Sequence, residues 1–188
     1  SHLLIYPAKE DDLNKKYSCL PPKNSKPLRY LVVMIKVPVA GRVKTRLARD
    51  IGTIQATNFY RHTLGILIRR VANSPRWTTI LAISPDNAYK TPTLPHHVCR
   101  YPQGRGNLGQ RLEKVFNTYA PNPTVIIGSD IPGITHGHIA EAFRHLAGKR
   151  GIIGPSHDGG YWLIGLRRHK KGVKILQSIS WSSQSVLE

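Results

Sequence analysis

Apolar stretches alternate with amphipathic ones along the chain from residue 30 onward. Residues 30–37 form a nearly continuous run of β-branched and aliphatic side chains, YLVVMIKV. Such a run is typical of a strand buried on both faces of a parallel sheet. Within 55–73, apolar residues recur at helical spacing and predict an amphipathic helix. Further strands are predicted at 77–84 and, with a more polar sequence, near 97–101.

The second half of the chain repeats this alternation. Helical spacing predicts a helix that ends before Pro121, and the segment 124–128, TVIIG, predicts a strand. Another helix follows, with Thr135 as its N-cap. Two closely spaced strands are predicted at 151–154 and 161–166. The order βαββαβαββ predicts an α/β fold, a three-layer α/β/α sandwich around a mainly parallel sheet.

The first part of the chain lacks such periodicity. Residues 1–27 are polar and punctuated by prolines, so we interpret them as an N-terminal extension and residues 28–188 as one domain. No apolar run approaches the ~18 residues of a membrane span, and no secretion signal is recognisable. A cytoplasmic protein is therefore expected. Cys19 and Cys99 are too few for a disulfide framework or a four-ligand zinc site.

The charge balance points to an anionic partner. The chain has 28 Lys and Arg against 10 Asp and Glu, a net charge of +18. This excess fits nucleic acid, phospholipid or the phosphates of a nucleotide, although a solvated basic surface explains it as well. Carboxylates are scarce. Between residues 51 and 187 they are Asp86, Glu113, Asp130, Glu141 and Asp158. Any metal ligand or general base in that stretch comes from these five.

The loop that follows the first predicted strand suits a phosphate. It places Lys36, Arg42, Lys44 and Arg46 around Gly41. Backbone N–H groups combined with lysine and arginine are what a diphosphate or triphosphate needs. The loop lacks the spacing of a Walker A motif. A plain basic surface turn is the alternative interpretation.

Two carboxylates stand beside glycines where strands are predicted to end. Asp130 follows TVIIG in the motif GSDIP, at the carboxyl edge of the sheet. It suits Mg²⁺, which proteins bind with one or two carboxylates and substrate phosphates, or it merely caps the next turn. Asp158 precedes Gly159 and Gly160, which permit positive φ and close approach of a ligand. The same three residues also suit an ordinary hairpin turn.

The segment 104–109 imitates a dinucleotide-binding fingerprint. Its sequence, GRGNLG, matches GxGxxG, precedes a predicted helix, and has Asp130 about 20 residues further on. The strand before it, HHVCRY, is polar, whereas the first strand of a dinucleotide fold is usually apolar. NAD binding through 104–109 therefore stays as an alternative.

Three motifs follow one another along the chain: KVPVAGRVKTRLA, GSDIP and GPSHDGGYWLIGL, with QGRGNLGQRL between the first two. Together, over about residues 31–187, they resemble a bacterial family of GT-A-type nucleotide-diphospho-sugar transferases, formerly a domain of unknown function and often labelled glycosyltransferase. The set is more distantly similar to nucleotidylyltransferases such as 2-phospho-lactate guanylyltransferase. The resemblance implies a GT-A-type fold. It also implies transfer from a nucleotide sugar or an NTP to a small-molecule acceptor, assisted by Mg²⁺ or Mn²⁺.

The resemblance also assigns roles to residues. Nucleotide and phosphate binding is expected of Lys36, Gly41, Arg42, Lys44, Arg46, Gly106, Asn107 and Arg111. The acceptor side is expected to comprise Asp158, Gly159, Gly160 and Tyr161. Asp130 is the expected metal ligand. Lys44 and Asp158 are the expected catalytic residues. Lys44, with Arg46 and Mg²⁺ on Asp130, would stabilise the leaving phosphate, and Asp158 would take the acceptor's proton or would instead hold the ion or the substrate.

The chain departs from the family pattern in two places. The family commonly has GDLG where this chain has GNLG at 106–109, and often Glu at the position of Gln110. The site is thus expected to carry one charge less at Asn107. Family members generally continue past Leu187 into a further strand, so the domain is expected to lack a C-terminal segment. Two alternatives stay open: a nucleic-acid or polyanion-binding protein on the same fold, and NAD binding. No feature predicts the oligomeric state.

Overall fold

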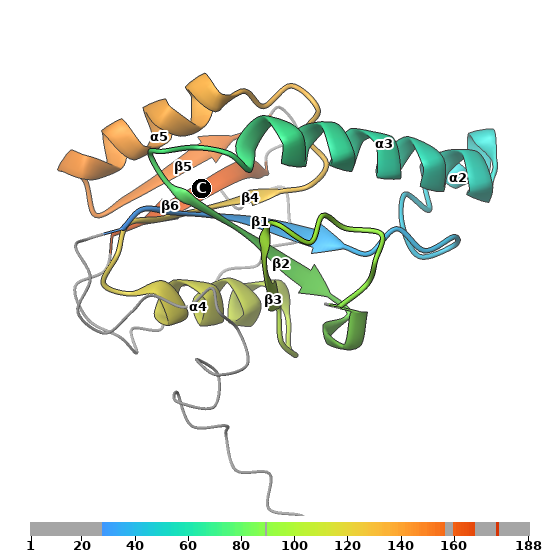
Figure 1. The fold of residues 1–188 in the computed structure, drawn as a ribbon, viewed down its shortest axis with the longest axis horizontal. Helices are drawn as coiled ribbons and strands as arrows, with labels where there is room; N and C mark the ends of the chain where they lie inside the picture. The colour runs from blue at the N-terminus through green and yellow to red at the C-terminus, as the bar shows by residue number, and fades with distance from the viewer. Residues whose placement is uncertain (1–27, 89, 157–159, 168–175, 177–188) are drawn as a thin grey trace, which may run out of the picture.

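The strands of the protein form one mixed sheet (Figure 1). The computed structural model describes residues 28–88, 90–156, 160–167 and 176. In sheet order the strands are β3 (Cys99–Pro102), β2 (Thr78–Ser84), β1 (Tyr30–Lys36), β4 (Thr124–Gly128), β6 (Tyr161–Leu166) and β5 (Gly151–Pro155). The pairs β3–β2, β2–β1 and β1–β4 are parallel, whereas β4–β6 and β6–β5 are antiparallel. The predicted mainly parallel sheet is confirmed.

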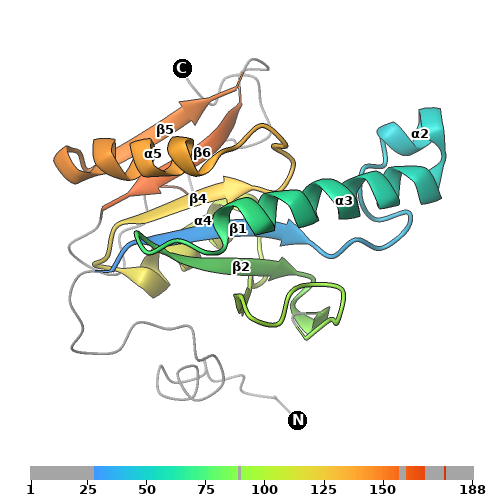
Figure 2. The ribbon, with the colours of Figure 1, turned by 45° about the horizontal axis from the view of Figure 1, so that its top comes forward.

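Helices cover both faces of this sheet. The helices are α2 (Leu47–Ile51), α3 (Thr53–Val71), α4 (Leu108–Tyr119) and α5 (His136–Gly148), with a short 3-10 turn η1 (Asp86–Ala88). Figures 1 and 2 show α3 and α5 on one face and α4 on the other. The predicted three-layer α/β/α sandwich is therefore confirmed. The N-terminal extension 1–27, together with Asp158 and Gly159, lies outside the described residues.

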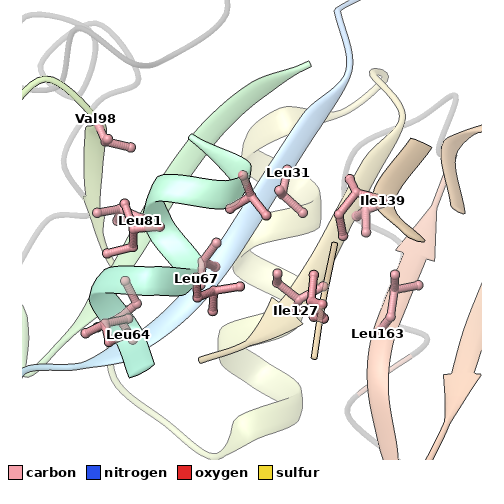
Figure 3. Close-up of a cluster of buried hydrophobic side chains, with 14 of the residues drawn as sticks. Leu31, Leu64, Leu67, Leu81, Val98, Ile127, Ile139 and Leu163 are labelled. Carbon is pink, nitrogen blue, oxygen red and sulfur yellow. The ribbon is translucent and has the colours of Figure 1, made fainter. Parts of the chain in front are cut away.

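The central strand β1 supplies side chains to both layers of the core. Leu31 and Val33 belong to the cluster beneath α3 and α5, and the neighbouring Tyr30 and Val32 belong to the cluster beneath α4. This alternation follows from the two-residue period of a strand, and it explains why the β1 sequence is apolar at nearly every position. Figure 3 shows the first cluster, in which side chains of α3 and α5 meet those of the strands.

Helices α4 and α5 each begin with a capping box. The Asn107 side chain accepts from the backbone N–H of Gln110, and the Gln110 side chain accepts from that of Asn107, each at 2.9 Å. Thr135 and His138 make the same reciprocal pair at the start of α5. The N-cap predicted at Thr135 is confirmed. Such caps satisfy backbone donors that a helix start leaves free.

The four parallel strands β3, β2, β1 and β4 place the connections that follow them at one edge of the sheet. The carboxyl ends of β1, β2 and β4 lie side by side because these strands are neighbours and run in the same direction. In open α/β sheets, ligands bind beyond this edge. Within the part of the chain that the structure describes, no helix is both long and apolar enough to cross a membrane.

Candidate functional site

A cavity of about 500 Å³ opens at the carboxyl edge of the sheet. Strands β1 and β4 end at it, and the loop after β1, helix α3 and the start of α4 complete its wall. It is lined by Met34, Ile35, Lys36, Arg42, Val43, Lys44, Thr45, Tyr60, Gln103, Leu108, Arg111, Gly128, Ser129 and Asp130. The cavity therefore joins the first-loop motif to GSDIP, which are far apart in sequence.

Positive charge predominates in this cavity. Four cationic side chains line it, Lys36, Arg42, Lys44 and Arg111, whereas Asp130 is its one carboxylate among the described residues. The Lys44 Nζ lies 3.4 Å from an oxygen of Asp130. Because the Asp130 side chain is 59% exposed, water screens this pair, and it contributes at most about 1 kcal/mol to stability. The net positive charge suits an anionic ligand.

The phosphate-type loop has an unusual backbone at two positions. Gly41 has φ of 76° and Lys44 has φ of 49°. Glycine adopts such angles freely, whereas a lysine pays about 1–3 kcal/mol for them. Lys44 is the non-glycine residue with positive φ in the described part of the chain. A strained backbone that carries a cation into a cavity is a mark of a functional position.

Tyr60 ties three elements together at the floor of the cavity. Its hydroxyl donates to the Lys36 carbonyl at the end of β1, 3.0 Å away. Because that bond uses its one proton, the Ser129 hydroxyl donates to Tyr60 over 2.9 Å. Burial raises the pKa of Tyr60, and the nearby charge of Asp130 adds to this effect. Tyr60 therefore stays protonated and holds Ser129 beside Asp130.

Gln103 is a buried amide with all its hydrogen-bonding groups occupied. The side chain is 4% exposed, and its Nε2 donates to the carbonyls of Ile35 and Ala82, at 3.0 and 2.9 Å. Its Oε1 accepts from Arg111 Nη1 at 2.9 Å. Gln103 thereby joins the ends of β1 and β2 and fixes the guanidinium of Arg111 at the cavity wall.

The glycines of the segment 104–109 are explained by contacts within the protein. Gly104 and Gly106 have φ of 88° and 104°. The Lys114 side chain lies 2.6 Å from where a Cβ of Gly104 would stand. A Cβ at Gly106 would likewise collide with the Gln110 side chain. In addition, the Gly104 N–H donates to the carboxylate of Asp86 over 2.9 Å. Local packing therefore accounts for both glycines without a dinucleotide.

The structure brings five of the predicted residues together in the cavity: Lys36, Arg42, Lys44, Arg111 and Asp130. It places the other described ones outside the cavity lining: Gly41, Arg46, Gly106, Asn107, Gly160 and Tyr161. Arg46 precedes α2, and the Asn107 side chain caps α4. Tyr161 packs against the core cluster beneath α4, and burial raises its pKa to about 12.

Most of the five scarce carboxylates have other partners. Glu113 is 2% exposed and accepts from the Leu176 N–H at 2.9 Å, while Asp86 accepts from Gly104. Glu141 lies on the surface of α5, in an ion pair with Arg144 and with the His145 ring 3.5 Å away. Asp130 is therefore the described carboxylate that is placed to meet a ligand in the cavity.

A metal ion would have few protein ligands here. Among the described residues, no group of three or more His, Cys, Asp or Glu side chains is arranged to hold one. A single carboxylate fits Mg²⁺ where phosphate oxygens and water fill the remaining positions. Asp130, with the adjacent Ser129 hydroxyl, is compatible with that mode of binding but not with a cage made by protein alone.

The sheet and its edge cavity define an α/β protein of the nucleotide-diphospho-sugar transferase-like fold. The structure superposes on a crystal structure from Desulfovibrio desulfuricans G20, of a protein described as a "putative nucleotide-diphospho-sugar transferase", with a TM-score of 0.74. The two chains are 26% identical, over 84% of this chain and 71% of the other.

The chain belongs to the bacterial family described as "Uncharacterized protein conserved in bacteria (DUF2064)", whose model matches residues 67–183. Among curated proteins, none matches the chain significantly. The family match includes Gln103, Arg111 and Asp130 but begins after the first loop and Tyr60. The cavity therefore combines residues of the matched region with residues before it.

Two residues of the cavity, Tyr60 and Gln103, are not predicted by the sequence patterns. Tyr60 falls on the buried face of an amphipathic helix, where an aromatic residue looks like ordinary core. Gln103 has a faint signal, since it is a polar residue that directly follows a strand and opens QGRGNLGQRL. Their roles depend on partners that are distant in sequence.

Proposed function

We propose that the protein is a transferase that binds the diphosphate portion of a nucleotide sugar, or of an NTP, in the cavity at the sheet edge. The observation that carries this proposal is the meeting of four cationic side chains with one carboxylate in that cavity. The likeness to a protein described as a nucleotide-diphospho-sugar transferase supports the same class.

The arrangement supplies a preorganised anion site. Arg111 offers a planar fork of donors, the geometry that matches phosphate oxygens, and its hydrogen bond to Gln103 holds one end of that fork. Lys44 adds a compact charge from the loop after β1. Groups that are fixed before the reaction stabilise developing charge without reorganising, which is how such sites accelerate transfer.

Both candidate reactions place new negative charge in this cavity. In glycosyl transfer the bond from the anomeric carbon to the diphosphate breaks, the acceptor oxygen bonds to that carbon, and a nucleoside diphosphate leaves. In nucleotidyl transfer the acceptor bonds to the α-phosphorus, and pyrophosphate leaves. Where the acceptor is a hydroxyl group, its proton passes to a base, the role proposed for Asp158. Lys44 and Arg111 would stabilise the diphosphate or pyrophosphate that departs.

Asp130 is the proposed ligand of a divalent ion. Mg²⁺ bound there would neutralise phosphate charge and orient the phosphate oxygens. Ser129, which Tyr60 holds in place, fixes the position from which Asp130 reaches the cavity. The present partner of Asp130 is Lys44, so an arriving ion would take up the carboxylate and leave the lysine for the phosphate.

The proposal is tested by thermal stability with a panel of nucleotides. Uridine and guanosine diphosphate sugars, the NTPs, NAD and an oligonucleotide are each added with and without Mg²⁺. A ligand at about 100 times its Kd stabilises the folded state by about 2.7 kcal/mol, which raises Tm by about 5–10 °C for a chain of this size. A metal-dependent shift with a nucleotide sugar or NTP is expected.

Matched variants locate the binding site. Arg111→Gln should reduce the shift to about half or less, since a tenfold loss of affinity leaves about 1.4 kcal/mol of the stabilisation. Arg76→Gln, which removes an exposed arginine outside the cavity, should retain the full shift. Silence with every nucleotide would overturn the proposal. A metal-independent shift with NAD alone would favour the dinucleotide alternative instead, and a shift with the oligonucleotide alone would favour the polyanion alternative.

A further inference from the structure

A short arm extends from the carboxyl edge of the sheet. We call residues 39–61 the α2 arm; it comprises the loop after β1, helix α2 and the first turns of α3. Figures 1 and 2 both show α2 and the start of α3 reaching beyond the ends of β1 and β2. None of the five residues of α2 is buried. This helix therefore contributes nothing to the described core.

The α2 arm carries most of the exposed apolar side chains of the described residues. Val39, Ile51, Ile54 and Phe59 are 42%, 44%, 68% and 48% exposed, and the fifth such residue, Ile153, lies on β5. Single exposed apolar residues are ordinary on a protein surface. Four of them in one projecting segment single out that segment as a candidate interaction site.

The same segment is strongly basic. Its sequence contains Arg42, Lys44, Arg46, Arg49 and Arg61, against Asp50 as its one carboxylate. Lys44 contacts Asp130 in the cavity, while Arg42, Arg46, Arg49 and Arg61 are exposed. Apolar and cationic side chains are thus mixed on one arm.

We propose that the α2 arm binds the surface of an anionic phospholipid membrane. Segments that lie in the membrane interface insert apolar side chains among the acyl chains while arginine and lysine contact the phosphates. The arm offers both kinds of group together: Ile54 and Phe59 for insertion, Arg46 and Arg49 for the lipid phosphates. It spans no bilayer and needs only to reach the boundary between the headgroups and the acyl chains.

The composition of the arm favours a membrane over other partners. A nucleic-acid backbone would meet the arginines but would offer no apolar environment to Ile51 and Ile54. A second copy of the chain would meet the apolar residues, yet both copies carry a net charge of +18 and would repel each other. An anionic membrane satisfies the apolar and the cationic residues at once.

Membrane binding through the α2 arm would also affect the cavity, because the two share residues. Arg42, Lys44 and Thr45 belong both to the arm and to the cavity wall. Binding through the arm would therefore bring the cavity close to the lipid headgroups. The docking proposal stands on the arm's own residues and does not depend on transferase activity.

Vesicle co-sedimentation tests the proposal with the full chain. Vesicles of phosphatidylcholine alone are compared with vesicles in which about one third of the lipid is phosphatidylglycerol, at about 0.1 M salt. The wild-type chain should bind the anionic vesicles and not the neutral ones. Ile54→Ser/Phe59→Ser should weaken binding at least about tenfold. Arg46→Gln/Arg49→Gln should weaken it about thirtyfold, since each basic residue contributes about fivefold.

Matched controls separate the arm from general surface charge. Ile153→Ser removes an apolar residue of β5 that is 51% exposed, between the values for Phe59 and Ile54. Arg76→Gln/Arg144→Gln removes two exposed arginines from elsewhere. Both should bind within about twofold of the wild-type chain, because neither alters the arm. All these positions are on the surface, so every variant should keep its Tm within about 2 °C.

Four results would overturn the proposal. The first is no binding of the wild-type chain to anionic vesicles, and the second is equal loss in the control variants. The third is vesicle binding that survives Ile54→Ser/Phe59→Ser, with oligonucleotide binding lost in Arg46→Gln/Arg49→Gln. The fourth is a concentration-dependent dimer, seen by light scattering, that Ile54→Ser/Phe59→Ser abolishes, which would assign the arm to a second copy.

Discussion

Gln103 and Arg111 form a hydrogen bond of 2.9 Å that joins the interior of the sheet to the wall of the cavity. The amide group of Gln103 donates to carbonyls of both β1 and β2. The position of Arg111 is therefore coupled to the ends of the two central strands. This relationship makes Gln103 a positioning residue, which acts on a ligand through the arginine.

Gln103→Leu should impair both functions of this amide, the joining of the two strands and the positioning of Arg111. The substitution leaves the strand carbonyls and Arg111 without their buried partner, so the free energy of unfolding should fall by about 1–3 kcal/mol. Urea denaturation measures this change. Diphosphate binding should also weaken, because the guanidinium loses its fixed orientation.

A double variant tests whether Gln103 affects diphosphate binding through Arg111. If Gln103 acts through Arg111, then Gln103→Leu/Arg111→Gln should bind pyrophosphate no more weakly than Arg111→Gln alone. Additive losses of affinity in the double variant would show that Gln103 acts on the ligand by a different route.

Tyr60→Phe should loosen the floor of the cavity without leaving a void. The variant keeps the ring in its apolar site and removes the hydrogen bonds to Lys36 and Ser129. We expect a loss of about 1–2 kcal/mol in the free energy of unfolding, together with weaker Mg²⁺-dependent nucleotide binding. Thr63→Val, at the half-buried neighbouring position on α3, serves as the control, since it also removes one hydroxyl. If Tyr60→Phe binds nucleotides as tightly as the wild-type chain, the hydrogen bond between Ser129 and Tyr60 has no role in nucleotide binding.

The buried tyrosines should make the protein sensitive to alkali. Burial raises the pKa of Tyr30 to about 12, and the pKa values of Tyr60, Tyr101 and Tyr161 are raised as well. In the unfolded chain these hydroxyls titrate near 10, so above that pH the folded state holds more protons than the unfolded state. Stability contributed by these groups is thus complete below about pH 10 and is lost as the pH rises toward about 12.

Urea denaturation at a series of alkaline pH values, followed alongside tyrosinate absorbance, checks this prediction. The midpoint should fall over the interval from about pH 10 to 12, and much of the tyrosinate signal should appear only with unfolding. Full ionisation of Tyr30 near pH 10 in a chain that is still folded would contradict the burial argument.

Asn107→Ala should destabilise α4 specifically. The Asn107 side chain is half of a capping box, and loss of such a cap costs about 1 kcal/mol. Asn107→Asp keeps the accepting oxygen and places a negative charge at the positive end of the helix, so it should retain full stability. Thr135→Ala removes the equivalent cap at the start of α5, so the free energy of unfolding should fall by a similar amount. Equal stabilities of Asn107→Ala and the wild-type chain would refute the capping role.

The fold followed from the sequence where patterns are local and repeated. The continuous apolar run at β1 predicted a strand buried on both faces, and its side chains do enter both core clusters. The helix predicted over 55–73 is observed at Thr53–Val71. The two strands predicted at 151–154 and 161–166 are observed as the antiparallel neighbours β5 and β6. Helix α2 was not predictable, because a short helix with no buried residue has no apolar period.

The candidate site followed from the sequence only in part. Cations clustered in one loop and an aspartate after a strand are visible as motifs, and Lys44 and Asp130 do meet in the cavity. Gln103 and Tyr60 act through backbone carbonyls that tertiary structure brings to them, and no local pattern reports such partners. The capping role of Asn107 was visible in the sequence. Gln110 follows Asn107 by three positions, which is the spacing of a capping box.

The most direct test of the cavity as a diphosphate site is the binding of inorganic pyrophosphate, with Mg²⁺, measured by titration calorimetry. Pyrophosphate carries the charge common to both proposed substrates and has neither base nor sugar. Lys44→Gln and Arg111→Gln should each weaken binding at least about tenfold, the loss expected for one charge-assisted hydrogen bond. Arg76→Gln should bind as the wild-type chain does. Equal affinity of pyrophosphate for all four proteins would contradict a diphosphate site at this edge of the sheet.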